Sequence, residues 1–410
     1  MKLFVRTFGC RANHYDSEAM MQAATRGGHE LVGDPVLADM AVFNSCAVTS
    51  EAERDVRKAV RRAAAANPRL RTVVMGCAAA LPGSVSALRA LPTVEHVIGG
   101  GDVAAVAAAL GVLGGSGATE RQRSVRAVLR VQDGCDEHCT FCATTIARGA
   151  NRSRPIAALI DEATALAEHH PEIVITGTHI GTYGADIGSS LGSLLAHLVR
   201  RVPRVRFRLS SIEATEVDGQ LADLLTGAAG RVTPHLHAPL QSGSNRVLRR
   251  MGRHWYTAQS YAVAIERIAA ASPVFGFGAD VIVGFPGETD EDFAATETLV
   301  RQLPFTYLHV FIYSPRSGTA ALRLPDAVGS GTARDRSLRL REMAAAKARD
   351  YATRRAGSVA DVVVHAGPPD REGMTEDYLT VHIPGARSRG ERFATTLALE
   401  GGSLLVTRDS

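Results

Sequence analysis

Short apolar runs alternate with helical patterns along most of this chain, and this alternation restricts its fold more than any other feature. Three runs in the first 110 residues have the composition of buried strands: KLFVRTF, MAVFNS and TVVMG. The helical pattern between the last two begins with a capping box of Ser50 and Glu53 and ends before Pro68. Strands that alternate with helices form parallel sheets with both faces covered, so the sequence predicts a doubly wound α/β domain.

The same alternation resumes beyond residues 111–124, a glycine-rich and then charged stretch that is typical of a linker between domains. Six further strands are expected there, with helical patterns between them. Six parallel strand–helix units favour a partial barrel over a closed eightfold one. The expected strands are 126–132, 172–177, 205–211, 234–238, 274–283 and 307–312.

The end of the chain has a different pattern. An arginine-rich helix at about 333–355 leads to short β patterns that are separated by glycine, proline and charged turns. A small antiparallel β-barrel is therefore expected in the last part of the chain. The whole is predicted to be an α/β protein with domains at 1–113, 122–350 and 356–410.

Three of the six cysteines follow the predicted strands of the first domain, one after each strand. Ligands of open parallel sheets bind beyond the carboxyl ends of the strands, so these three thiols are expected to form one site. The N-terminal residues lack the apolar stretch of a secretory signal, which predicts a cytoplasmic protein. In a reducing compartment, cysteines are metal ligands or catalytic thiols more often than disulfides. The three cysteines are Cys10, Cys46 and Cys77.

The other three cysteines are crowded into VQDGCDEHCTFC with the spacing C-x3-C-x2-C, on the loop after the first barrel strand. Zinc needs four closed ligands, and the nearby fourth candidate, His138, lies inside the first spacing, where the geometry is poor. A cubane iron–sulfur cluster with three cysteine ligands leaves one iron open to a substrate or cofactor. A structural cluster without chemistry is a third interpretation. The crowded cysteines are Cys135, Cys139 and Cys142.

Charge and hydropathy bear on the partners. The net charge is +4, and arginines such as Arg57, Arg61 and Arg62 cluster on one predicted helix. Such a cluster fits a phosphate backbone and fits a solvated helix face equally well. No run of 18 or more apolar residues occurs in the sequence, so no membrane partner is expected. A zinc-containing RNA-binding protein stays open as the non-enzymatic alternative.

The two cysteine sets and the sequence around them resemble the radical S-adenosylmethionine methylthiotransferases in order and spacing over essentially the whole chain. The motifs that carry the resemblance are FGCRAN, NSCAVT, MGCAA, QDGCDEHCTFC, ARGANRSRP, RFRLSSIE, HLHAPLQSGSNRVLRRMGR, DVIVGFPGETDEDF and YSPRSGTAA. A lone C-x3-C-x2-C is moderate support, and three more cysteines at strand ends make the match specific.

The resemblance implies two [4Fe–4S] clusters and S-adenosylmethionine as cofactors. The crowded cysteines would hold the cluster that cleaves S-adenosylmethionine to a 5′-deoxyadenosyl radical, and the upstream three would hold an auxiliary cluster that carries the sulfur to be transferred. An electron-donor protein of the flavodoxin or ferredoxin type is implied as a partner. A one-cluster radical enzyme, in which the upstream set is only structural, is the intermediate alternative.

The resemblance also limits the substrate to three classes. These are isopentenyladenosine of tRNA, threonylcarbamoyladenosine of tRNA and an aspartate of a ribosomal protein. GCRAN, LSSIE and HLHAPLQSGS are most similar to the enzymes that act on threonylcarbamoyladenosine at position 37 of tRNA. This adenosine is next to the anticodon in a loop, where a base can be splayed out for an enzyme to reach.

The candidate binding residues follow from the same resemblance and from the predicted strand ends. RNA contacts are expected at the mouth of the barrel, on Arg148, Arg152 and Arg154. One departure is that Ala143, Thr144 and Thr145 stand where the family usually has apolar residues and a proline. On the strand at 234–238, His235 and His237 are either core histidines or cofactor contacts. The expected contacts with S-adenosylmethionine are Phe141, Gly177, Ser211, Glu213, Gln241 and Asp280.

Overall fold

The computed structural model describes residues 1–112, 119–367 and 371–407. Residues 113–118 of the predicted linker therefore lie outside the described residues. The chain divides into two compact units, each built from three separate segments. The first comprises Met1–Gln122, Gln132–Arg152 and Ser314–Arg323, and the second comprises Arg123–Val131, Ser153–Tyr313 and Leu324–Ser410. Both cysteine sets belong to the first unit, whereas the predicted domain boundaries stay predictions.

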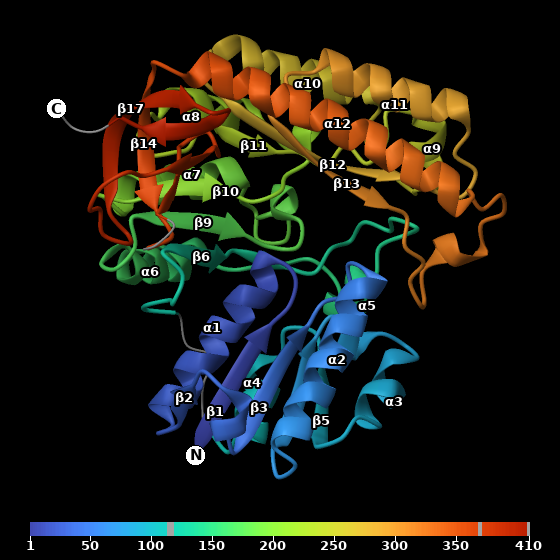
Figure 1. The fold of residues 1–410 in the computed structure, drawn as a ribbon, viewed down its shortest axis with the longest axis vertical. Coiled ribbons are helices and arrows are strands. Elements are labelled where there is room, and N and C mark those ends of the chain that lie inside the picture. Colours follow the sequence, from blue (N-terminus) through green and yellow to red (C-terminus); the bar gives the residue numbers. More distant parts are fainter. Residues whose placement is uncertain (113–118, 368–370, 408–410) are drawn as a thin grey trace. The chain divides into compact units, whose positions relative to one another are not determined.

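The first unit contains a five-stranded parallel sheet with the order β2-β1-β3-β4-β5 (Figure 1). All six residues of β3 are buried, because helices cover both faces of the sheet. The doubly wound prediction is confirmed, although strands β2 and β5 were not predicted. The strands are β1 (Lys2–Thr7), β2 (Glu30–Val32), β3 (Met40–Ser45), β4 (Arg71–Gly76) and β5 (Val94–Gly99), and the helices are α1 (Arg11–Arg26), α2 (Ser50–Ala66), α3 (Ser84–Arg89), α4 (Val103–Ala109) and α5 (Thr144–Arg148).

The predicted capping box of α2 is wrong by one residue. Thr49, not Ser50, is the N-cap, and its side-chain oxygen accepts a hydrogen bond from the Ala52 N–H at 3.1 Å. Glu53 does not reach back to the cap and instead pairs with Arg316 at 3.0 Å. The Glu53 carboxylate, which the local sequence pattern predicted to cap the helix, thus pairs with a buried arginine instead.

The second unit contains the predicted partial barrel of six parallel strands. Two three-stranded sheets, β10-β9-β6 and β11-β12-β13, are linked by single β-bridges at Phe207–Val232 and Ser211–His237. Helices α10, α11 and α12 lie along the second sheet (Figure 1). The six predicted strands are confirmed as β6 (Arg126–Arg130), β9 (Glu172–Thr176), β10 (Arg206–Leu209), β11 (His235–His237), β12 (Gly276–Val283) and β13 (Tyr307–Ile312). The helices are α6 (Ile156–Ala167), α7 (Leu191–Arg201), α8 (Gly219–Gly227), α9 (Asn245–Arg250), α10 (Ala258–Ala271), α11 (Asp290–Gln302) and α12 (Ser330–Arg355), and two-residue strands β7 (Gln132–Asp133) and β8 (Arg152–Ser153) lie near the junctions of the segments.

The last part of the second unit is a closed five-stranded barrel with the order β14-β15-β16-β18-β17. This confirms the predicted β-domain, with one difference: β16 pairs with β18 in parallel, whereas the other pairs are antiparallel. Its core is formed by alternate aliphatic residues such as Val362, Val364 and Leu397. The strands are β14 (Val359–Val364), β15 (Glu372–Met374), β16 (Thr380–His382), β17 (Arg392–Glu400) and β18 (Ser403–Val406).

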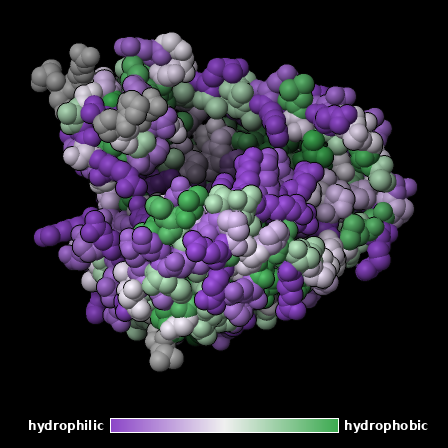
Figure 2. Space-filling model, turned by 60° about the horizontal axis from the view of Figure 1, so that its bottom comes forward, coloured by the Kyte–Doolittle hydropathy of each residue, from purple (hydrophilic) through white to green (hydrophobic). Residues whose placement is uncertain are grey.

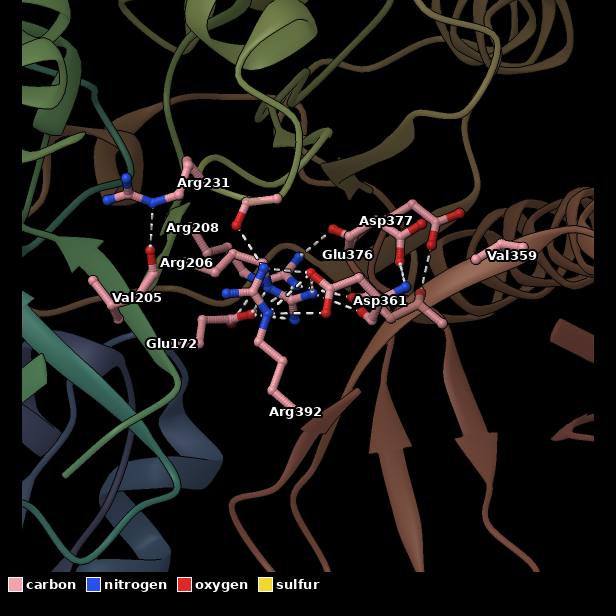
Figure 3. A network of polar contacts seen from close by, with 12 residues as sticks. Glu172, Val205, Arg206, Arg208, Arg231, Val359, Asp361, Glu376, Asp377 and Arg392 are labelled. Carbon is pink, nitrogen blue, oxygen red and sulfur yellow. Dashed lines mark hydrogen bonds and ion pairs between the residues drawn. The ribbon is translucent and has the colours of Figure 1, made fainter. Parts of the chain in front are cut away.

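A buried ion network joins this small barrel to the partial barrel within the second unit (Figure 3). Glu172, at the start of β9, is fully buried and accepts hydrogen bonds at 2.8 Å from the Nε atoms of Arg206 and Arg208. Arg206 also pairs with Asp361 of β14 at 3.0 Å, and Arg208 donates to the backbone oxygen of Thr375 at 2.9 Å. Burial alone raises the pKa of Glu172, but Arg208 and Arg206 outweigh it and hold that pKa well below its usual range. The contact between the two barrels therefore depends on a charged glutamate.

The face of the molecule shown in Figure 2 is of mixed polarity. On the face shown in Figure 2, hydrophilic side chains lie between smaller groups of hydrophobic ones. Among the helices of the described residues, none has both the length and the apolar composition that crossing a membrane requires.

Candidate active site

The three upstream cysteines lie at the carboxyl ends of three adjacent strands. Cys10 follows β1, Cys46 follows β3 and Cys77 follows β4, and the sheet order places these strands side by side. Burial raises the pKa of Cys46 and raises that of Cys77 to about 11, and the neighbouring Cys10 adds to both effects. Thiols of such high pKa keep their protons at neutral pH unless a metal centre replaces the proton. This donor set fits an iron–sulfur cluster, and its role as ligands stays a prediction.

Two glycines permit the close approach of these thiols. Gly9 and Gly76 directly precede Cys10 and Cys77, and their φ angles are +98° and +99°. A Cβ atom on Gly9 would lie 2.5 Å from the Sγ atom of Cys46, which is much shorter than a van der Waals contact. A Cβ atom on Gly76 would lie 2.3 Å from a backbone oxygen. Each Gly-Cys pair is therefore required both by backbone conformation and by space.

If the upstream cysteines hold a cluster, replacing Gly9 by alanine is expected to lower the iron content of the protein, because the new methyl group displaces Cys46. The matched control is Gly28→Ala, since Gly28 also has a positive φ, +82°, but has open space where the methyl group would go. Both variants carry the backbone strain of about 1–3 kcal/mol, and only the first carries the clash. Iron analysis of the two anaerobically purified variants checks this, and equal iron contents would contradict it.

Arg148 lies at the end of α5 and joins this site to the crowded cysteine loop. Its side chain is 1% exposed and donates to Asp16 at 2.7 Å, to Asn13 at 2.8 Å and to Asp133 at 2.9 Å. Its Nε atom also donates to the Sγ atom of Cys77 at 3.4 Å. Burial alone lowers the pKa of Arg148, but Asp16 and the other anionic neighbours outweigh it, so the pKa lies above its usual value. The positively charged guanidinium of Arg148 is therefore held in a fixed position next to the sulfur of Cys77.

This placement corrects the prediction that Arg148 contacts RNA, since a buried guanidinium held by two carboxylates cannot reach a phosphate. Arg152 is exposed and donates to the backbone oxygen of Arg148 at 3.2 Å. In the second unit, Arg154 pairs with Glu162 at 2.6 Å. RNA contacts at Arg152 and Arg154 stay predictions.

The crowded cysteines form a loop held by backbone hydrogen bonds and by the start of α5. Cys135 N–H donates to Gly149 O at 3.0 Å, and Cys142 N–H donates to Cys139 O at 3.1 Å. The sulfur of Cys142 accepts from the Thr144 N–H at 3.4 Å and lies 3.1 Å from the Thr144 hydroxyl. Thr144, which departs from the family pattern, thus gives this sulfur a second polar neighbour. Such hydrogen bonds to cysteine ligands tune the reduction potential of a cluster.

The predicted contacts with S-adenosylmethionine fall in both units. Phe141 lies between two crowded cysteines in the first unit. In the second unit, Glu213 is buried and pairs with Arg253; burial raises its pKa, and Arg253 opposes that effect. Gln241 has a φ of +60° and is held to β12 by its N–H, which donates to Asp280 O at 2.8 Å. Gly177, Ser211, Glu213 and Gln241 follow successive strands of the second unit, whereas Asp280 lies within β12. The binding roles of all five stay predictions.

A polar cluster on β11, β12 and β13 includes one residue that the sequence analysis missed. Asp280 Oδ1 accepts from His237 Nε2 at 3.0 Å and from His309 Nδ1 at 3.1 Å. Burial alone raises the pKa of Asp280, but the hydrogen bonds from His237 and His309 outweigh it and keep that pKa well below its usual range. His235, in contrast, is buried and stacks on Tyr378. The sequence signal that could have identified His309 is its position on the predicted strand, where it shares one face with Tyr307 and Phe311.

Comparisons with known proteins agree with the fold. Residues 2–99 match the family described as "Uncharacterized protein family UPF0004", and residues 129–300 match the "Radical SAM superfamily". The threonylcarbamoyladenosine tRNA methylthiotransferase MtaB of Bacillus subtilis is 33% identical over 97% of this chain and 93% of its own length. A tRNA-2-methylthio-N(6)-dimethylallyladenosine synthase of Cereibacter sphaeroides is 36% identical over 80% of this chain and 79% of its own. The radical S-adenosylmethionine methyltransferase TsrM of Kitasatospora setae, solved with cobalamin and a [4Fe-4S] cluster, shares the fold with a TM-score of 0.57, at 16% identity over 77% of this chain and 76% of that chain.

Proposed function

Because the chain belongs to the family of radical S-adenosylmethionine methylthiotransferases, we propose that it converts N6-threonylcarbamoyladenosine of tRNA to the 2-methylthio derivative. The observation that carries this proposal is the convergence of Cys10, Cys46 and Cys77 at three strand ends, in the same unit as the crowded cysteine loop. The relative that matches over 97% of this chain is named for the same substrate.

The family uses an iron–sulfur cluster and S-adenosylmethionine, and we propose that this chain holds two clusters. Bound cofactors of this kind supply the radical and the sulfur to be transferred. The crowded cysteines would hold one cluster and the upstream cysteines the other. The positively charged guanidinium of Arg148 lies next to the sulfur of Cys77, and the ion pairs with Asp16 and Asp133 hold this guanidinium in place. The chain's own part is thus to position the sulfur ligands and to set the electrostatics around them.

The partners follow from this chemistry. The substrate is tRNA, and an electron-donor protein of the flavodoxin or ferredoxin type is needed to reduce the cluster that cleaves S-adenosylmethionine. A cytoplasmic location, where tRNA and such donors occur, belongs to the same proposal. We place RNA contacts on the exposed Arg152 rather than on the buried Arg148.

Deleting the gene is expected to remove the methylthio group from threonylcarbamoyladenosine of cellular tRNA and to leave methylthio-isopentenyladenosine unchanged. Mass spectrometry of nucleosides from digested tRNA measures both, and the deletion strain that carries the intact gene on a plasmid is the control. The family contains both kinds of enzyme, since the Cereibacter sphaeroides relative is named for dimethylallyladenosine. If the methylthio group is lost from isopentenyladenosine instead, that nucleoside is the substrate. If it is lost from neither nucleoside, both substrates are rejected.

A further inference from the structure

We propose that His237, Asp280 and His309 form a divalent-cation site on the sheet of β11, β12 and β13. The register of the sheet brings the three residues together, since Asp280 is the partner of His309 and His237 is the partner of Gly278. They lie on the face opposite to Phe277, Ala279 and Val281, whose side chains belong to the apolar core. The site is therefore built from one face of a rigid sheet.

The donor atoms are close enough to share one ion. Asp280 Oδ1 lies 3.0 Å from His237 Nε2 and 3.1 Å from His309 Nδ1. All three atoms lie within 4.8 Å of one another. Nitrogen and oxygen ligands bind an ion such as zinc at about 2.0–2.2 Å, so two donors of one ion are up to about 4.4 Å apart. The two pairs that include Asp280 Oδ1, at 3.0 and 3.1 Å, are within this limit.

The hydrogen bonds around His237 support metal binding through its Nε2 atom. A histidine that binds a metal through one nitrogen usually donates a hydrogen bond from the other. His237 Nδ1 lies 3.0 Å from the hydroxyl of Tyr307, and His235 Nε2 lies 2.9 Å from the same hydroxyl. With an ion on Nε2, His237 donates to Tyr307, and the Tyr307 hydroxyl donates to His235 in turn. Each of these three groups therefore keeps a partner when the ion binds.

Space and exposure also fit a site with open coordination positions. A Cβ atom on Gly278 would lie 2.0 Å from the Tyr307 ring. The absence of a side chain at Gly278 therefore provides the space for this ring, which lies next to His237. The side chains of His237, Asp280 and His309 are 8%, 25% and 54% exposed, which gives an ion a buried anchor and an accessible side. Two imidazoles and one carboxylate suit Mn²⁺, Fe²⁺, Co²⁺ or Zn²⁺, with positions left for other ligands.

The expected role of the ion rests on the proposed function. A threonylcarbamoyl group carries carboxylate and carbonyl oxygens, which are ligands for such an ion, whereas an isopentenyl group offers none. Without a cation, the negative charge of Asp280 would repel the substrate carboxylate. We therefore expect the ion to favour threonylcarbamoyladenosine over isopentenyladenosine.

Titration of the anaerobic holoprotein with Mn²⁺ alone tests the site, with binding measured as loss of the free-ion signal in electron paramagnetic resonance. Mn²⁺ prefers oxygen and nitrogen ligands, so the cysteines do not compete for it. We expect one Mn²⁺ per wild-type chain, none in Asp280→Asn, at least tenfold weaker binding in His309→Gln, and about 10- to 100-fold weaker binding in Tyr307→Phe. The matched control is His382→Gln, an exposed histidine on β16, which should bind as the wild type does.

The titration overturns the site if the wild type binds no more Mn²⁺ than Asp280→Asn, or if both Asp280→Asn and His309→Gln keep wild-type affinity. His309 is exposed, so His309→Gln is expected to fold, and circular dichroism and iron content of each variant verify this. Methylthiolation of the two modified tRNAs with and without Mn²⁺ tests the role in selectivity. If the preference between the two tRNAs is the same with and without Mn²⁺, the role in selectivity is overturned. If the wild type leaves threonylcarbamoyladenosine unmodified, the proposed function is rejected. The ion site is then decided by the titration alone.

Discussion

Replacing Cys10, Cys46 and Cys77 together by alanine is expected to abolish methylthiolation of tRNA while leaving reductive cleavage of S-adenosylmethionine intact. The three thiols converge at the ends of β1, β3 and β4, apart in sequence from the C-x3-C-x2-C loop. If each set holds one [4Fe–4S] cluster, the variant keeps about four of eight irons per chain. Iron analysis, 5′-deoxyadenosine release and the methylthio nucleoside in tRNA are the three measurements.

The matched control changes the other set of three thiols, Cys135, Cys139 and Cys142. It is expected to lose 5′-deoxyadenosine formation as well as methylthiolation, because radical generation precedes sulfur transfer. Both triple variants remove the same number of thiols, so a general loss of stability would affect them alike. Methylthiolation that survives in the upstream variant would refute the two-cluster proposal and favour the one-cluster alternative. Stoichiometric zinc in a colourless wild-type protein would favour the zinc-containing RNA-binding protein instead.

Replacing Glu172 by glutamine is expected to destabilise the second unit by about 3–5 kcal/mol, because it leaves two buried guanidinium groups without their shared carboxylate. Arg206 and Arg208 are both fully buried, and each bonds to Glu172. The single tryptophan, Trp255, packs against the core of this unit, so its fluorescence during urea unfolding reports the loss. The same substitution at Glu391, which pairs with Arg387 on the surface, is the control and should cost less than about 1 kcal/mol.

The effect of Glu172→Gln should depend on pH in a definite direction. The folded state holds the pKa of Glu172 below the ordinary value, which is about 4.3 for glutamate. The carboxylate therefore stabilises the wild type fully above about pH 4.3, and this stabilisation is lost as the pH falls towards the lower folded-state pKa. The difference between wild type and variant should be constant around neutral pH and should shrink in acid. A difference that grows below pH 4 would contradict the ion network as its source.

The strand pattern and the cysteine positions were predictable because both depend on local sequence. Apolar runs indicate buried strands, and parallel strands place their carboxyl ends at one edge. The six strands of the partial barrel and the convergence of the upstream thiols follow from these two rules. Strands β2 and β5 did not, since β2 has three residues and β5 (VEHVIG) has no buried residue and no continuous apolar run.

Interactions between distant segments could not be predicted in the same way. Arg148 and Arg152 are alike in the sequence, yet only Arg148 is buried, because it pairs with Asp16, which lies more than a hundred positions upstream. Arg152 is exposed. Glu53 was likewise assigned to a helix cap, whereas Arg316 takes it. His309 became a candidate only when the register placed it beside Asp280. In each case the partner comes from another element, which no local pattern specifies.

The segmented course of the chain bears on how such an enzyme can be divided or recombined. The first unit draws residues from three stretches, Met1–Gln122, Gln132–Arg152 and Ser314–Arg323. A protease cut in the linker would therefore break the covalent connection between the upstream thiols and two residues of the same unit, Arg148, which donates to Cys77, and Arg316, which pairs with Glu53. A gene fusion point there would combine these thiols with the Arg148 and Arg316 positions of another protein. An exchange of the N-terminal region between two relatives would have to carry the cysteine loop and residues 314–323 along with it. The two cysteine sets would thus have to be exchanged together, although most of the sequence between the loop and residue 314 belongs to the other unit.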